Sequence, residues 1–134
     1  MGNCELSRIR ILIIDRHEAV RRALSIRLGA HNQLEVVGVA TGPDEALARM
    51  AFLKPDVIIL GLQNGSDDDL IQTVFAVRDM VADTAVVIIL APYADAVERE
   101  LLLQAGAKRY LLKHINSQKL IQEIESVASA DANI

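Results

Sequence analysis

The sequence predicts an α/β domain in which helices cover both faces of a parallel sheet. Five short aliphatic runs alternate along the chain with five segments of helical periodicity. The aliphatic runs lack the polar alternation of a strand with one solvated face, so both faces of the sheet should be buried. Right-handed crossovers between such strands give a doubly wound, three-layer αβα arrangement.

Each element has its own local signal. The strands are expected at residues 9–14, 34–40, 57–60, 85–90 and 110–112. The first helix should run from about Glu18 to Gly29, and Gly42-Pro43 should open the second, since proline suits a first turn. Residues 61–69 read as a polar loop whose aspartates at 67–69 cap the third helix. The fourth helix should span residues 95–105 and stop at Gly106, and Asn116 or Ser117 should cap the fifth.

Length and composition limit the class of protein. A chain of 134 residues suits one domain, and its 51% hydrophobic and 3% aromatic content requires an aliphatic core. A net charge of -4 argues against direct nucleic-acid binding, which needs a basic face. One cysteine, Cys4, cannot form an internal disulfide, and no apolar run approaches the roughly 18 residues of a membrane span. We therefore expect a cytoplasmic protein without a membrane segment, with a flexible N-terminus (1–8), one domain (9–128) and a C-terminal tail (129–134).

Functional groups of a doubly wound sheet collect at the carboxyl ends of its strands. In this sequence those positions hold Asp15-Arg16-His17, the segment from Gly61 to Gln63, Ala91 and Lys113. These residues are therefore the candidates for a site.

Four segments resemble the receiver domain of response regulators (CheY-like), in particular the LuxR/NarL-type branch that is fused to DNA-binding domains. They are Ile11-Leu12-Ile13-Ile14-Asp15-Arg16-His17-Glu18, Glu35-Val36-Val37-Gly38-Val39-Ala40, Lys54-Pro55-Asp56-Val57-Ile58-Ile59-Leu60 and Ala105-Gly106-Ala107-Lys108-Arg109-Tyr110-Leu111-Leu112-Lys113. The resemblance implies a flavodoxin-like fold with a five-stranded parallel sheet of order 2-1-3-4-5. An unrelated flavodoxin-like domain is the alternative.

The resemblance assigns a role to each candidate position. The position of the family's phosphoacceptor aspartate is occupied here by Gly61. The positions of its two magnesium-binding acids are occupied by Asp15 and Arg16, and the metal-binding backbone carbonyl would come from Gln63. The resemblance places the switch hydroxyl at Ala91, the family's lysine at Lys113 and its switch aromatic at Tyr110. Glycine cannot form an acyl phosphate, arginine is a permanent cation, and alanine has no hydroxyl.

The resemblance therefore implies a degenerate, atypical pseudo-receiver with no catalytic residue. One carboxylate between Arg16 and Lys113 is a poor site for Mg²⁺, which needs several oxygen ligands, so we expect neither metal nor cofactor. Arg16 or Lys113 should neutralise Asp15 directly, because an unpaired carboxylate in a partly buried cleft is costly. Without a hydroxyl at Ala91, Tyr110 should rest in one state.

The run Leu101-Leu102-Leu103 suggests a contact surface. Three successive helical residues fan over about 200° at 100° each, so one core-facing stripe cannot hide all three. By resemblance this helix belongs to the face that receivers use for dimers and partners, formed by the fourth helix, fifth strand and fifth helix. Ile115 and Ile121 are expected to extend the patch.

Two functions of different classes follow. The first is a non-enzymatic receiver in two-component or phosphorelay signal transduction that is independent of phosphorylation. It would act through a protein partner or a homodimer and regulate transcription through a fused or partner DNA-binding domain. The alternative is a domain that binds a small anion between Arg16, Lys113 and the backbone amides after Gly61. Phosphorylation at an unusual site, such as the aspartates at 67–69, ranks last.

Overall fold

The computed structural model describes residues 8–63 and 67–132, in which strands and helices alternate without exception. The elements are β1 (Ile9–Ile14), α1 (Glu18–Gly29), β2 (Leu34–Ala40), α2 (Pro43–Leu53), β3 (Val57–Gly61), α3 (Asp67–Ala82), β4 (Val86–Ala91), α4 (Ala96–Ala105), β5 (Arg109–Leu112) and α5 (Ser117–Ala132). The expected flexible N-terminus lies, except for Arg8, outside the described residues. No helix in the described ranges is long and apolar enough to cross a membrane.

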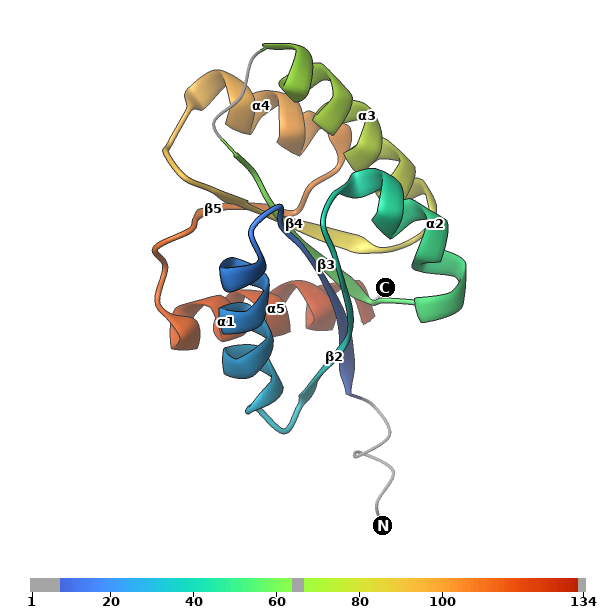
Figure 1. Ribbon diagram of the computed structural model, residues 1–134, viewed down its shortest axis with the longest axis vertical. Coiled ribbons are helices and arrows are strands. Elements are labelled where there is room, and N and C mark those ends of the chain that lie inside the picture. Colours follow the sequence, from blue (N-terminus) through green and yellow to red (C-terminus); the bar gives the residue numbers. More distant parts are fainter. Residues whose placement is uncertain (1–7, 64–66, 133–134) are drawn as a thin grey trace.

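The five strands form one parallel sheet of order β2-β1-β3-β4-β5, which confirms the predicted fold class. Figure 1 shows α1 and α5 on one face of this sheet and α2, α3 and α4 on the other. A separate aliphatic core fills each interface between sheet and helices. Such an arrangement follows from strands that present apolar side chains on both faces.

Burial differs between the central and the edge strands. Along β4 every side chain is buried, and along β3 every one is buried except at Gly61. All four side chains of β5 and most of those of β2 are only half-buried, because each edge strand has one neighbour instead of two. The strand ends nevertheless lie within one residue of the predicted positions.

The helix ends follow from particular residues. The Asp95 carboxylate accepts the Glu98 N–H at 2.9 Å and caps α4, and Gly106 ends it with a φ of 122° that favours glycine. Of the two candidate caps of α5, Asn116 is the one used, because its side chain accepts the Lys119 N–H at 2.8 Å.

The third helix begins earlier than predicted. It starts at Asp67, whereas the sequence was interpreted as a loop through residue 69. Aspartate is favourable within a first helical turn as well as before it, so a run of aspartates does not mark the residue at which the helix begins. The fifth helix continues to Ala132, past the expected start of a C-terminal tail at residue 129.

Candidate functional site

The sheet brings the carboxyl ends of four strands together. Ile14 of β1 is aligned with Leu60 of β3, so Asp15 and Gly61 follow side by side. On the other side, Gly61 pairs with Leu90 of β4. The Lys113 N–H donates to the Ala91 carbonyl at 2.8 Å, which places Lys113 at the same edge of the sheet.

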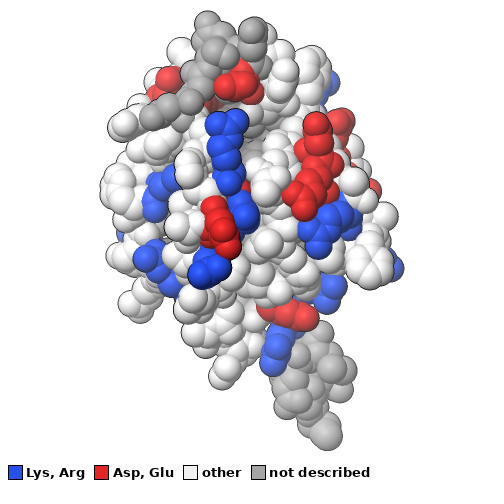
Figure 2. Space-filling model, in the orientation of Figure 1, with Lys and Arg blue, Asp and Glu red and all other residues white. Residues whose placement is uncertain are grey.

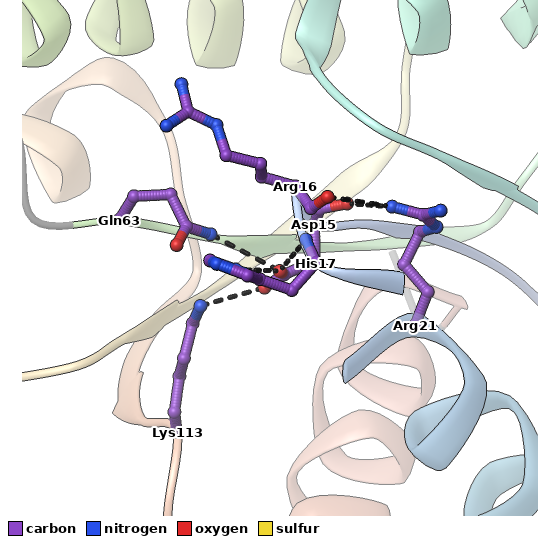
Figure 3. Close-up of polar contacts among 6 residues, drawn as sticks. All are labelled: Asp15, Arg16, His17, Arg21, Gln63 and Lys113. Carbon is purple, nitrogen blue, oxygen red and sulfur yellow. Dashed lines mark hydrogen bonds and ion pairs between the residues drawn. The ribbon is translucent and has the colours of Figure 1, made fainter. Parts of the chain in front are cut away.

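Asp15 is the one buried charged residue among those described, with 1% of its surface exposed. Its Oδ2 accepts from the Lys113 ammonium at 2.8 Å, and its Oδ1 accepts from the His17 N–H at 2.9 Å and from Gln63 Nε2 at 3.3 Å. Figure 3 shows these groups converging on the carboxylate. A buried charge is tolerable only with such pairing, so Asp15 is held in a fixed, neutralised arrangement.

Gly61 lies directly against this carboxylate. A Cβ atom added at Gly61 would lie 2.1 Å from Asp15 Oδ2 and 3.0 Å from Asp15 Cγ. Real Cβ contacts are never that close, so the Asp15 carboxylate occupies the space that a side chain at residue 61 would need. No pattern in the sequence indicates that Asp15 fills the space beside Gly61.

Arg16 turns away from its neighbour. Figure 3 shows its side chain extending away from the Asp15 carboxylate, and within the described part of the chain its guanidinium makes no hydrogen bond or ion pair. Of the two cations expected to neutralise Asp15, the structure uses Lys113. The turn itself is held by Arg21, whose Nη1 donates to the carbonyls of Asp15 at 2.8 Å and Arg16 at 3.1 Å.

Tyr110 on β5 is tied to α4. Its hydroxyl donates to Glu98 Oε1 at 2.5 Å and lies 3.2 Å from the Tyr93 carbonyl. Burial and the hydrogen bond to Glu98 raise the pKa of Tyr110, so its hydroxyl stays protonated. Ala91, the neighbouring candidate, is fully buried and offers no polar group. The hydrogen-bond partners of Tyr110 are groups that the sequence did not identify.

A cavity of about 280 Å³ opens between α2 and α3, beside the end of β3. Its walls include three of the candidate residues, Arg16, Gly61 and Gln63, but not Lys113. The other polar walls are Thr41, Asp44, Asp69, Gln72, Thr73 and Glu98. Apart from Asp69, which belongs to the aspartate run at 67–69, the sequence pattern does not mark this second set, because its members come from three helices and the loop before α2.

The leucine triplet divides as the helical fan predicts. Leu102 is fully buried, Leu103 is half-buried against the core, and Leu101 is 39% exposed. Val97, one helical turn before Leu101, is 66% exposed, and Tyr93, in the segment before α4, is 67% exposed. Ile115 and Ile121 are half-buried and pack against the core on the α1 and α5 side of the sheet.

The residues present do not fit a Mg²⁺ ion. The described residues contain no group of three or more His, Cys, Asp or Glu side chains arranged around a metal position. Asp15 supplies one carboxylate, and both of its oxygens are already bonded to Lys113, Gln63 and the His17 N–H. A hard cation needs several free oxygen ligands, and this one carboxylate does not supply them.

Comparison with known proteins identifies the family. The sequence model of the family "Response regulator receiver domain" matches residues 11–125 of this chain. The chain is 31% identical over 123 residues to the DNA-binding transcriptional activator DevR/DosR of Mycobacterium tuberculosis, covering 90% of this chain and 55% of that protein. It is 29% identical over 126 residues to the transcriptional regulatory protein LiaR of Bacillus subtilis, covering 94% and 59%.

A solved structure shows the same fold. The signal receiver domain of the putative response regulator NarL from Mycobacterium tuberculosis superposes with a TM-score of 0.79 at 21% identity, covering 92% of this chain and 98% of that one. The chain spans just over half the length of the two curated relatives. On its sequence and its fold, this chain belongs to the family of response regulator receiver domains.

Proposed function

We propose that this receiver domain signals without being phosphorylated and acts through protein contacts. The observation that carries the proposal is the place of the Asp15 carboxylate, which fills the space a side chain at Gly61 would need and is bonded to Lys113. The family's lysine, which would otherwise meet a phosphoryl group, already has a permanent anionic partner. The pocket is therefore held in one charge-balanced state without a ligand.

The other positions support the same proposal. An acyl phosphate needs a nucleophilic carboxylate, and Gly61 has none. Arg16 contributes a positive charge where a metal site requires a ligand oxygen, and Ala91 has no hydroxyl for a phosphoryl oxygen. All three positions differ from the residues that the family uses for phosphorylation. Three such differences in one pocket favour loss of phosphorylation over an adjustment of its rate. The domain then has no catalytic residue and needs no cofactor.

The partner surface of this proposal is the face around Leu101. Val97 and Leu101 are exposed one helical turn apart on α4, and Tyr93 is exposed in the segment before this helix. The Tyr110 hydroxyl is bonded to Glu98 of the same helix and to the Tyr93 carbonyl. Burial of apolar area drives most protein association, and a second copy of the chain or another protein would bury these exposed side chains. Hydrogen bonds to Glu98 and to the Tyr93 carbonyl hold Tyr110 against the α4 segment of this surface.

The output proposed is regulation of transcription through a DNA-binding domain, fused or separate. DevR/DosR is a DNA-binding transcriptional activator and LiaR a transcriptional regulatory protein, and each is longer than the matched region. Figure 2 shows acidic and basic side chains interspersed on one face of the domain, without a basic stripe there, and the net charge is -4. DNA contact is therefore assigned to the output domain.

Labelling with a small phosphodonor tests the proposal. The chain is incubated with acetyl phosphate and Mg²⁺ beside a receiver that carries the aspartate, and intact masses are measured. We expect the control to gain a phosphoryl group and this chain to gain none, and millimolar Mg²⁺ to leave its melting temperature unchanged, because an ion that binds the folded state would raise it. Stoichiometric labelling that hydroxylamine removes would show that another aspartate serves, and would overturn the proposal.

A further inference from the structure

The cavity between α2 and α3 has the build of a ligand site. Its floor is apolar and consists of Ile14, Leu60, Leu62, Leu70 and Ala76. Its rim carries hydroxyl and amide groups, among them Thr41, Gln63 and Gln72. Small-molecule sites combine an apolar lining with a few polar groups in this way.

The charges of the rim are unusual. Arg16 and Asp44 both line the cavity, and within the described residues neither side chain makes a hydrogen bond or an ion pair. Asp69 and Glu98 add two further carboxylates. A rim with one guanidinium and three carboxylates does not suit a simple anion, because the acids would repel it. It suits a molecule that carries both an anionic and a cationic group.

We propose that this cavity binds a small zwitterion of the α-amino-acid type with an apolar side chain. The Arg16 fork receives the carboxylate, since guanidinium and carboxylate form two parallel hydrogen bonds. The ammonium lies on the acidic side of the rim, which Asp44 and Glu98 provide, and the side chain covers the apolar floor. A cavity of about 280 Å³ lies near the lower end of the volumes typical of small-molecule sites, so a small amino acid such as leucine is a suitable probe.

Glu98 connects the cavity to the surface of α4. The same carboxylate that lines the cavity accepts the Tyr110 hydroxyl, and in α4 Glu98 directly follows Val97 of the proposed partner face. An ammonium group near Glu98 competes with Tyr110 for this carboxylate. Occupancy of the cavity would thus change the position of Tyr110, and with it the partner face. Binding of a ligand in the cavity does not depend on the proposed function. The coupling between the cavity and the face around Leu101 does rest on it.

Calorimetry and thermal melts of the 134-residue chain test the binding site with three matched probes. L-Leucine carries both charges, 4-methylpentanoate lacks the ammonium, and 3-methylbutylamine lacks the carboxylate. We expect leucine, at millimolar concentration, to release or absorb heat and raise the melting temperature, and the other two to bind at least about tenfold more weakly. If L-leucine and L-phenylalanine both give neither heat nor a shift, or if 4-methylpentanoate binds as tightly as leucine, the proposal is overturned.

Two substitutions locate the site. Arg16→Gln and Glu98→Gln should each weaken leucine binding by about tenfold to a hundredfold, because each removes one charged hydrogen-bond partner. Arg16 is exposed, and a glutamine at residue 98 still offers an oxygen to Tyr110, so both variants should fold. Arg22→Gln, on exposed α1 and paired with Glu18, is the matched control and should bind normally. Unchanged affinity in both test variants would place the ligand elsewhere.

A spectroscopic measurement tests the coupling. The chain has two tyrosines and no tryptophan, so Tyr93→Phe leaves Tyr110 as the one fluorescent tyrosine. Leucine should change the emission of Tyr110 in this variant and should leave it unchanged when Glu98→Gln is added. Binding by calorimetry without a change in tyrosine emission would retain the site and refute the coupling.

Discussion

The buried Asp15 carboxylate takes its stabilisation from three segments that lie far apart in the sequence. Lys113 follows β5, Gln63 follows β3, and the His17 N–H belongs to the turn after β1. The sequence predicted that a cation would neutralise Asp15, because burying an unpaired charge is costly. It could not decide between Arg16 and Lys113, since both follow strands that end at the same edge. The choice depends on side-chain direction, which periodicity does not encode.

Replacing Lys113 should destabilise the fold through Asp15. Lys113→Met leaves a buried carboxylate without its cation, and we expect a loss of about 3 kcal/mol in the free energy of unfolding, measured by urea denaturation. Adding Asp15→Asn should recover most of that loss, because the uncompensated charge is gone. Lys119→Met, at an exposed position of α5, is the matched control. Equal stability of the Lys113 and Lys119 variants would show that the ion pair contributes nothing.

A side chain at Gly61 should destabilise the domain unless Asp15 is shortened. Gly61→Ala forces the Asp15 carboxylate from its place and should cost about 1–3 kcal/mol, as overpacking does. In an Asp15→Ala background the same change should be close to neutral. Gly42→Ala serves as the control, since a Cβ there meets nothing within 4 Å. If thermal melts show the same cost for Gly61→Ala in both backgrounds, Asp15 is not what excludes the side chain.

At the level of elements, the strands were easier to predict than the loops. β1 and β2 have the predicted bounds, because aliphatic runs in parallel sheets carry a strong signal. The start of α3 was wrong by about three residues, because aspartates favour both a loop and a first helical turn. The walls of the cavity come from several elements, so no single segment of sequence identified them. The sequence therefore predicts individual strands and helices well, but it predicts poorly which side chains from different elements meet in a cavity.

The fourth helix should separate core packing from partner contact. Leu101→Glu changes a 39% exposed residue and should leave the melting temperature nearly unchanged, whereas Leu102→Glu buries a charge and should unfold the domain. If the α4 face forms a twofold dimer, Leu101→Glu acts twice and should weaken it by a hundredfold or more, at roughly 1.5–3 kcal/mol per leucine. Sedimentation measures the dimer.

An exposed residue of α3 provides the control for that experiment. Ile71 is 55% exposed and lies outside the α4 face, so Ile71→Glu should leave association unchanged. A parent chain that is monomeric at high concentration, together with equal effects of the Ile71 and Leu101 variants, would remove α4 from consideration as the partner surface.

For the whole molecule, the fold identifies the family, whereas the side chains of the site determine the chemistry. The sheet order, the two aliphatic cores and the match over residues 11–125 establish a receiver domain. A fold does not determine chemistry, which depends on particular side chains at the ends of the strands. The proposed loss of phosphorylation therefore rests on three positions, Gly61, Arg16 and Ala91, within an otherwise ordinary scaffold.

Rebuilding those positions tests this account most directly. Four chains are treated with acetyl phosphate and Mg²⁺ and their intact masses compared: the parent, Gly61→Asp, the triple variant Gly61→Asp, Arg16→Asp, Ala91→Thr, and the triple variant with Lys113→Met as a negative control. We expect no label on the parent or on Gly61→Asp, because in the single variant Arg16 remains to pair with the new carboxylate. The triple variant should gain one hydroxylamine-labile phosphoryl group, since it restores the nucleophile, the metal ligand and the hydroxyl. Stoichiometric labelling of the parent chain would contradict the account.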